Sequence, residues 1–304
     1  MAPRPRNTAR ARRWHASVSK GQPKHDTHLS RGPARFVALV YHDVHPGETF
    51  DYGRLGRSAT MYHVPERAFR SQLDVIEGSG LRCLDAAAVR ACLAGQGTPG
   101  EVGVVITFDD GWRGAVERAA RAVAERRMPA FFFVATGLIG RRYFAGELEW
   151  RQLDPTLFTI GSHGVTHRML SDLPSGEIRA ELRDSRRRLE DLLDRPVRWL
   201  SIPGGAVSRR VIQSAEAAGY DHIFTSEVGT NPTGLGRRNI ARVGMKRATD
   251  LAALGRWLGG DLRREKARAA ILALPKRLLG MRRYSKVRRA LLGEAAGSEH
   301  FFEP

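Results

Sequence analysis

Cysteine is scarce in this chain, since only Cys83 and Cys92 occur among 304 residues. Two cysteines cannot build the disulfide framework of a small secreted domain. Cys83 lies in a short predicted strand and Cys92 in an alanine-rich predicted helix. We therefore expect both to be small hydrophobic core residues rather than metal ligands or nucleophiles.

Long apolar runs are also absent. No stretch reaches the roughly 20 apolar residues that a membrane-spanning helix needs. Arg12-Arg13 resembles a twin-arginine start, but no apolar stretch of about 7–15 residues follows it, which argues against a secretory signal. We therefore expect a cytoplasmic protein.

Acidic residues are fewer than basic residues, and the excess of positive charge is unevenly distributed along the chain. The chain carries 50 Lys and Arg against 32 Asp and Glu, a formal net charge of +18. Residues 1–35 hold +8 and residues 261–293 hold +9, whereas residues 36–260 hold only +4 and the acidic residues 294–304 hold −3. Because the basicity lies in the ends, a nucleic-acid-binding role for the central region is disfavoured. Residues 1–35 have almost no large aliphatic side chains, and we expect a disordered tail.

The C-terminal extension, residues 261–304, has a basic amphipathic pattern. From Ala267 to Leu292 aliphatic residues alternate with Lys and Arg, and the pattern is typical of a helix interrupted near Pro275 and Gly280. Two interpretations remain open. The helix packs on the domain with its basic face in solvent, or it attaches the protein peripherally to an anionic membrane surface.

The central region, residues 36–260, predicts one α/β domain. The whole chain of 304 residues has a hydrophobic content of 42%, which is enough to bury one large core. Predicted strands alternate with predicted helices at least six times, which favours a parallel barrel or a doubly wound sheet. The strands are expected at 36–44, 81–84, 104–108, 130–135, 158–161, 197–202, 222–226 and 240–243, and the helices at 64–76, 85–92, 113–127, 175–194 and 208–218.

Two adjacent carboxylates follow the run Val104-Val105-Ile106-Thr107-Phe108. Asp109 and Asp110 stand at the end of a predicted buried strand, and Gly111 allows a sharp turn after them. Adjacent side chains at a strand end diverge, so one carboxylate can bind a cation while its neighbour stays free as a base. The alternative is that Asp-Asp-Gly forms an ordinary turn without a functional site, because these residues are common in turns.

Two histidines, His163 and His167, follow a second apolar run, Phe158–Gly161. If this segment is helical or tightly turned, both imidazoles fall on one face. Two His and one Asp would form a three-ligand metal site with open positions for water and substrate. An incidental surface pair is the alternative.

Thr107-Phe108-Asp109-Asp110-Gly111 followed by His-x3-His is similar to the first two motifs of the polysaccharide deacetylases of the NodB-homology type, carbohydrate esterase family 4. The resemblance implies that Asp109 is the general base. It also implies that Asp110, His163 and His167 hold the metal, with Zn²⁺ expected and another divalent transition metal allowed.

The resemblance extends over residues 36–245 and implies a distorted (β/α)7-type barrel. The third motif of the family, usually Arg-x-Pro-x-Gly, matches Ser201-Ile202-Pro203-Gly204-Gly205. By resemblance the Gly204 N–H helps to bind the oxyanion. Ser201 stands where the family has the arginine that orients the base, so the sequence leaves open what orients Asp109.

The general acid is expected in an unusual place. The family histidine near the C-terminus is missing after Arg242, but Val40-Tyr41-His42-Asp43 is similar to the N-terminal Tyr-His segment of circularly permuted members. The resemblance therefore implies His42 as the general acid. Thr225-Ser226-Glu227 occupies the place of the fourth motif, and the sequence assigns it no role.

The expected activity is metal-dependent removal of N-acetyl groups from an amino sugar in a polysaccharide, an oligosaccharide or a lipid-linked glycan precursor. A deacylase or deformylase acting on a small amino compound would use the same residues. A non-catalytic carbohydrate-binding relative would explain the missing arginine. The partner expected in each glycan case is an N-acetylated sugar.

Overall fold

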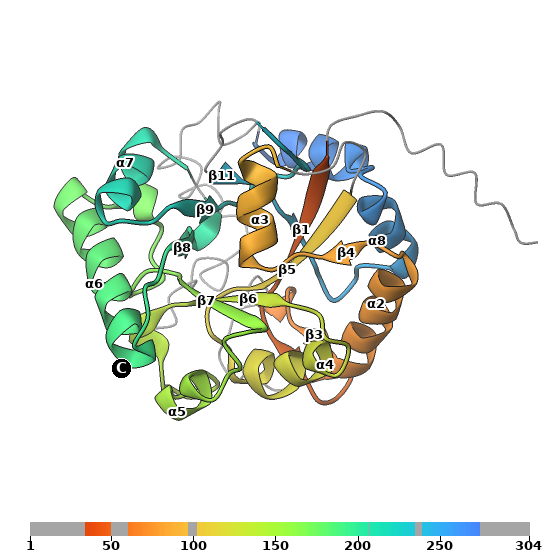
Figure 1. Cartoon of the computed structure of the whole chain (residues 1–304), viewed down its shortest axis with the longest axis horizontal. Coiled ribbons are helices and arrows are strands. Elements are labelled where there is room, and N and C mark those ends of the chain that lie inside the picture. The colour runs from red at the N-terminus through yellow and green to blue at the C-terminus, as the bar shows by residue number, and fades with distance from the viewer. Residues whose placement is uncertain (1–33, 50–59, 97–101, 206, 235–238, 274–304) are drawn as a thin grey trace, which may run out of the picture. The chain divides into compact units, whose positions relative to one another are not determined.

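The computed structural model describes residues 34–49, 60–96, 102–205, 207–234 and 239–273, which all belong to one compact unit (Figure 1). The predicted tail 1–35 thus falls almost wholly outside the described residues, as does the predicted extension after residue 273. Residues 263–273 are helical, in agreement with the pattern predicted there. Within the described ranges, no helix has the length and apolar character required to cross a bilayer.

Twelve strands are assigned among the described residues, and most follow the predicted positions. They are β1 Arg35–Tyr41, β2 Val44–His45, β3 Val64–Pro65, β4 Arg82–Cys83, β5 Val102–Phe108, β6 Ala130–Val134, β7 Phe158–Ser162, β8 Trp199–Ser201, β9 His222–Phe224, β10 Asn231–Pro232, β11 Asn239–Ile240 and β12 Val243–Gly244.

All five helices predicted for the central region are present, and the structure adds helices at 147–151 and 251–258 that were not predicted. The helices are α2 Glu66–Gly78, α3 Ala86–Leu93, α4 Arg121–Ala124, α5 Glu147–Arg151, α6 Ser175–Leu193, α7 Arg209–Ala217 and α8 Leu251–Leu258, with a π-helix η1 Ala115–Ala120 and short 3-10 turns η2 Thr136–Leu138, η3 Leu170–Asp172 and η4 Pro203–Gly205. Asp85 caps α3, because its side chain accepts a hydrogen bond from the Ala88 N–H. The predicted helix 113–127 differs, since its middle is a π-helix.

The main sheet is a nearly closed barrel. Its strands follow the order β10-β1-β5-β6-β7-β8-β9-β11, and the pairs from β1 through β9 to β11 are parallel. Because β12 follows β11 in the chain and pairs in parallel with β1, the ring of strands is almost completed. Figure 1 shows α3 at the centre of this ring and α2, α4, α5, α6, α7 and α8 around its outside. The predicted α/β barrel is confirmed.

Alternation along the strands creates two separate cores. Val37, Leu39 and Tyr41 of β1 belong to the large cluster between the sheet and the outer helices. Phe36 and Ala38 of the same strand belong to a smaller cluster that lines the barrel, together with aromatic side chains of β6, β8 and β9 and the apolar face of α3. Each cysteine packs at the margin of one of these clusters, so the prediction of core cysteines is confirmed.

The inward-facing positions become polar toward the carboxyl ends of the strands. Along β5 the inner face reads Val105, Thr107 and then Asp109, and along β8 it reads Trp199 and then Ser201. The aromatic layer thus forms a floor, and the polar layer above it lies at the rim where α/β barrels carry their sites.

The last predicted strand, 240–243, is divided in the structure. β11 pairs with β9, β12 pairs with β1, and the two residues between them, Ala241 and Arg242, belong to neither ladder. The chain changes its neighbour here because this one segment must bridge the gap between β9 and β1. The division places Arg242 at the level of the polar layer.

Candidate functional site

The paired carboxylates at the end of β5 diverge as predicted. Asp109 and Asp110 are both almost completely buried. Asp110 has a φ of 74°, a left-handed conformation that is uncommon outside glycine. This strained backbone turns the second carboxylate away from the first and toward the loop after β7.

Asp110, His163 and His167 form a group that could hold a metal ion. Their ligand atoms all lie within 4.8 Å of one another. The Asp110 Oδ1 atom is 3.3 Å from His163 Nε2 and 3.0 Å from His167 Nε2. Three side chains with this composition leave positions open for water and substrate.

The surroundings of the group fit a cation. The Trp112 indole N–H donates to Asp110 Oδ2 at 2.8 Å, whereas the buried Oδ1 atom accepts no hydrogen bond. His163 Nδ1 lies 2.7 Å from the Ser201 carbonyl oxygen, which assigns the proton to Nδ1 and leaves the Nε2 lone pair directed at the group. An unsatisfied carboxylate oxygen facing two imidazole nitrogens fits a divalent metal.

The segment that carries the two histidines is a loop and not a helix. A carboxylate from α6 holds it, because Glu181 accepts hydrogen bonds from the backbone N–H groups of Val165 and Thr166 at 2.7 and 3.0 Å. His167 has a φ of 59°, again left-handed. Of the two predicted conformations, helix and tight turn, the segment adopts the turn. The turn brings the imidazole rings of His163 and His167 together, with centroids 5.1 Å apart.

Asp109 forms a bidentate ion pair with Arg242, a residue to which the sequence motifs assigned no role. Arg242 donates from Nη1 to Oδ1 and from Nη2 to Oδ2, each at 2.8 Å. The Ser201 hydroxyl donates to the same carboxylate at 3.0 Å and accepts from Arg242 Nη2 at 2.8 Å. Burial works to raise the pKa of Asp109, but the Arg242 guanidinium outweighs it and holds that pKa below its ordinary value.

The other donors of Arg242 are also used inside the barrel. Its Nε–H donates to the Thr225 carbonyl oxygen at 2.9 Å and its Nη1–H to the Thr107 hydroxyl at 3.2 Å. The guanidinium lies 6.0 and 5.7 Å from the ring centres of Phe133 and Phe224. Arg242 therefore fills the position that the third motif leaves empty at Ser201, but it comes from another strand.

One signal in the sequence could have found this residue. Arg242 stands between Ile240 and Val243 in a predicted buried strand, and a buried arginine requires an acidic partner. Thr225-Ser226-Glu227 also gains a structural role, because the Thr225 carbonyl accepts from Arg242 Nε and the Glu227 carbonyl accepts from the Arg242 N–H at 2.8 Å.

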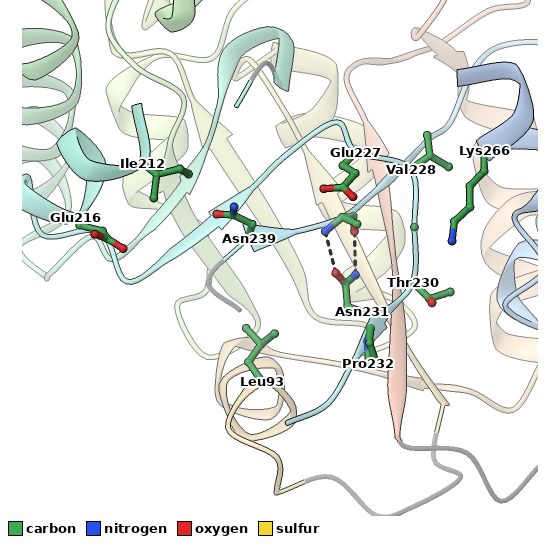
Figure 2. Close-up of a pocket in the computed structure, with 12 residues that line it drawn as sticks. Leu93, Ile212, Glu216, Glu227, Val228, Thr230, Asn231, Pro232, Asn239 and Lys266 are labelled. Atoms are coloured by element: carbon green, nitrogen blue, oxygen red, sulfur yellow. Dashed lines mark hydrogen bonds between the residues drawn. The ribbon is translucent and has the colours of Figure 1, made fainter. Parts of the chain in front are cut away.

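The backbone before Arg242 is held by a side-chain amide. The buried Asn231 donates from Nδ2 to the Ala241 carbonyl oxygen at 2.9 Å and accepts the Ala241 N–H at Oδ1 at 2.8 Å, as the dashed lines in Figure 2 show. These bonds replace the strand ladder at the point where the chain changes neighbours. Ala241 also lines a cavity of about 640 Å³, and Arg242 reaches from this position to Asp109.

We expect Asn231→Asp to lower the free energy of unfolding by about 1–3 kcal/mol at neutral pH, because the Ala241 carbonyl loses its donor and faces a charged oxygen. Burial would raise the pKa of the new carboxyl above its value in the unfolded chain. The folded state would then bind the extra proton, so the defect should be smaller at pH 5 than at pH 8. Urea unfolding at both pH values measures it.

Asn239→Asp is the matched control, because it adds the same charge in the same cavity (Figure 2) without removing the hydrogen bonds to Ala241. An equal loss in both variants would show that the amide clamp contributes nothing of its own, and a defect independent of pH would contradict the raised pKa.

His42 follows β1 and lies at the same rim. Burial lowers the pKa of its ring, while the carboxylates of Asp110 and Asp109 act in the opposite direction, which places His42 within electrostatic range of both acids. Its imidazole stacks on the Tyr62 ring with centroids 4.9 Å apart. The structure thus brings His42 to the predicted site.

The turn after β8 contains two left-handed glycines. Gly204 has a φ of 63° and Gly205 a φ of 64°. A Cβ atom at Gly204 would collide with the Met169 sulfur, and one at Gly205 would collide with Ser226. The exposed Gly204 therefore needs to be glycine, and it follows the strand that carries Ser201.

The comparisons with known proteins agree with the motifs. Residues 96–223 match the family model described as polysaccharide deacetylase. The chain is 23% identical over 226 residues to the Bacillus subtilis protein YxkH, which carries the name of a polysaccharide deacetylase; the match covers 74% of this chain and 77% of YxkH.

Solved structures share the fold. IcaB from Ammonifex degensii superimposes with a TM-score of 0.64 and 23% identity over 75% of this chain and 98% of that chain. The Streptococcus pyogenes deacetylase PplD, solved in complex with acetate, gives a TM-score of 0.62 and 21% identity over 73% and 97% of the two chains. The resemblance of this chain to the polysaccharide deacetylase family, inferred above from its motifs, is confirmed.

Proposed function

We propose that this protein is a metal-dependent hydrolase that removes N-acetyl groups from an amino sugar in a polysaccharide, an oligosaccharide or a lipid-linked glycan precursor. The observation that carries the proposal is the position of a clamped carboxylate, Asp109, directly beside the group of Asp110, His163 and His167. The likeness to polysaccharide deacetylases supports carbohydrate de-N-acetylation.

Asp110, His163 and His167 would hold the metal, for which Zn²⁺ is the first choice because it favours His and carboxylate ligands with an open position. When bound, such a cation lowers the pKa of water and polarises an amide carbonyl. Trp112 and the Ser201 carbonyl orient the Asp110 and His163 side chains for this task.

Asp109 is the proposed general base. Arg242 keeps its carboxylate ionised and fixed in orientation, so it can take a proton from the attacking water. His42 is the proposed general acid that protonates the leaving amine, and the Gly204 N–H is the proposed donor to the oxyanion. These three groups come from the ends of β5, β1 and β8, which all meet at one rim.

The domain limits are part of the proposal. Residues 36–260 would form the catalytic domain, between a basic tail at 1–35 and a basic extension at 261–304. Peripheral contact of that extension with an anionic membrane surface is consistent with its amphipathic sequence, but most of it lies outside the described residues.

The test measures acetate release from N-acetylglucosamine oligomers and from a lipid-linked N-acetylhexosamine, after chelation and after return of zinc. We expect zinc to restore release, and Asp109→Asn and His42→Ala each to lower it by about 10²–10⁴-fold, the usual contribution of general acid–base catalysis. His222→Ala is the control, since His222 stacks on Trp199 at the opposite end of the strands.

The outcomes separate the assignments. Normal release by His42→Ala would remove His42 as the acid and leave the deacetylase intact. If the zinc-loaded wild type releases no acetate from any sugar, the proposed function is wrong, and small N-acyl or N-formyl amines become the next substrates to assay.

A further inference from the structure

A lysine lies close to the proposed general acid. Lys246 follows β12, and β12 pairs in parallel with β1, so Lys246 and His42 lie at the same rim of the barrel. The Lys246 Nζ atom is 5.5 Å from the centre of the Tyr62 ring, and that ring stacks on the His42 imidazole. Tyr62 thus connects the ammonium to the side of the site where the amine would leave.

Among the described residues, Lys246 pairs with no carboxylate. The acidic side chains of the nearby loops are engaged elsewhere: Asp250 caps α8 by accepting the Ala253 N–H, and Glu48 pairs with Arg67 at 3.1 Å. A half-buried ammonium without a counter-ion is costly in free energy. A negatively charged ligand would supply the missing partner.

Two further cations, Arg247 and Arg268, bear on this position. Arg247 donates from Nη2 to His45 Nε2 at 3.2 Å and not to an acid. The charge of Arg268, on the helical segment 263–273, also acts on Lys246. Burial lowers the pKa of Lys246, and the charge of Arg268 lowers it further. Lys246, Arg247 and Arg268 are here called the basic cluster. Among the described residues none of the three pairs with a carboxylate, and the charge of Arg268 repels the Lys246 ammonium.

We propose that the basic cluster binds an anionic group of the substrate, a phosphate ester or a carboxylate, next to the amine that leaves. The inference rests on the proposed function, because it assigns the substrate class of that same site. The preferred substrate is thus an acidic N-acetylated glycan rather than a neutral one, and Lys246 determines the preference.

The test compares three ligands with the same sugar chain: neutral tri-N-acetylchitotriose, the same trimer carrying a phosphate ester, and the same trimer carrying a carboxylate. Dissociation constants are measured by calorimetry on the metal-free full-length chain, in which turnover does not interfere. We expect at least one acidic trimer to bind about 10-fold more tightly than the neutral one, in the range of a hydrogen bond to a charged group. The tighter of the two acidic ligands identifies the anionic group.

Lys246→Met keeps a long side chain against Tyr62 and removes the charge. We expect its preference for the acidic trimer to fall to about 1-fold, and the wild-type preference to shrink as salt is raised from about 50 mM to about 500 mM. Lys266→Met is the matched control, because Lys266 lies on the same helical segment as Arg268 but lines the cavity near Glu227 (Figure 2).

Equal affinities for all three trimers in the wild type, or a preference that survives Lys246→Met, would overturn the inference whether or not the enzyme is active. Acetate release by the zinc-loaded chain is then measured on the same ligands. If no acetate is released, the proposed function is contradicted. The ratios of the dissociation constants would still show whether the basic cluster binds an anionic group.

Discussion

Replacing Arg242 with methionine should be among the most damaging single changes in this protein. The substitution leaves Asp109 buried without its cation, and breaking one partner of a buried ion pair costs about 3–5 kcal/mol. We expect urea unfolding to report a loss of this size. Acetate release should fall by about 10²–10⁴-fold, because the proposed base is no longer held in one orientation.

Arg121→Met is the control for the loss of an ion-paired arginine. Arg121 pairs with Glu125 at the protein surface, where such pairs contribute about 0–1 kcal/mol. Comparable losses in both variants would mean that the Arg242–Asp109 pair has no special importance.

The double substitution Ser201→Arg with Arg242→Ser makes the test sharper. The Ser201 hydroxyl already contacts both Asp109 and Arg242, so an arginine at position 201 starts beside the same carboxylate. Ser201→Arg alone should be harmful, because two guanidinium groups would compete for one site. Partial recovery in the double variant would show that Asp109 needs a guanidinium and not a particular strand to carry it.

Asp110→Asn should abolish specific metal binding. Loss of a partner that only orients a metal ligand costs about 10–100-fold in affinity, so we expect at least about 100-fold weaker zinc binding when Asp110 itself loses its charge. Asparagine tolerates the left-handed backbone that Asp110 adopts. The change therefore removes the anionic ligand without adding backbone strain.

Calorimetric titration with zinc measures the affinity, and thermal unfolding provides a second readout. Zinc at about 100 times its dissociation constant should stabilise the wild type by about 2.7 kcal/mol and leave Asp110→Asn unaffected. Asp194→Asn is the matched control, since Asp194 is also left-handed but ends α6 on the surface. If Asp110→Asn bound zinc as tightly as the wild type does, Asp110 would not be a metal ligand.

The sequence by itself determined the architecture. Alternating apolar strands and capped helices follow from local propensity and periodicity, so β5, β6, α3 and α6 lie close to where they were predicted. The Asp109-Asp110 pair and the His163–His167 spacing are each local patterns, and the family resemblance joined them into one predicted metal group. Their convergence is confirmed geometrically.

The tertiary structure alone decided what orients Asp109. Arg242 is 133 residues away, and no local pattern records which strand of a closed barrel faces another across its interior. The division of the predicted strand 240–243 arose for the same reason: a segment that bridges β9 and β1 must change partners, which leaves Ala241 to be held by Asn231. Closure of the ring, a property of the whole sheet, therefore fixes the position of the arginine beside the base.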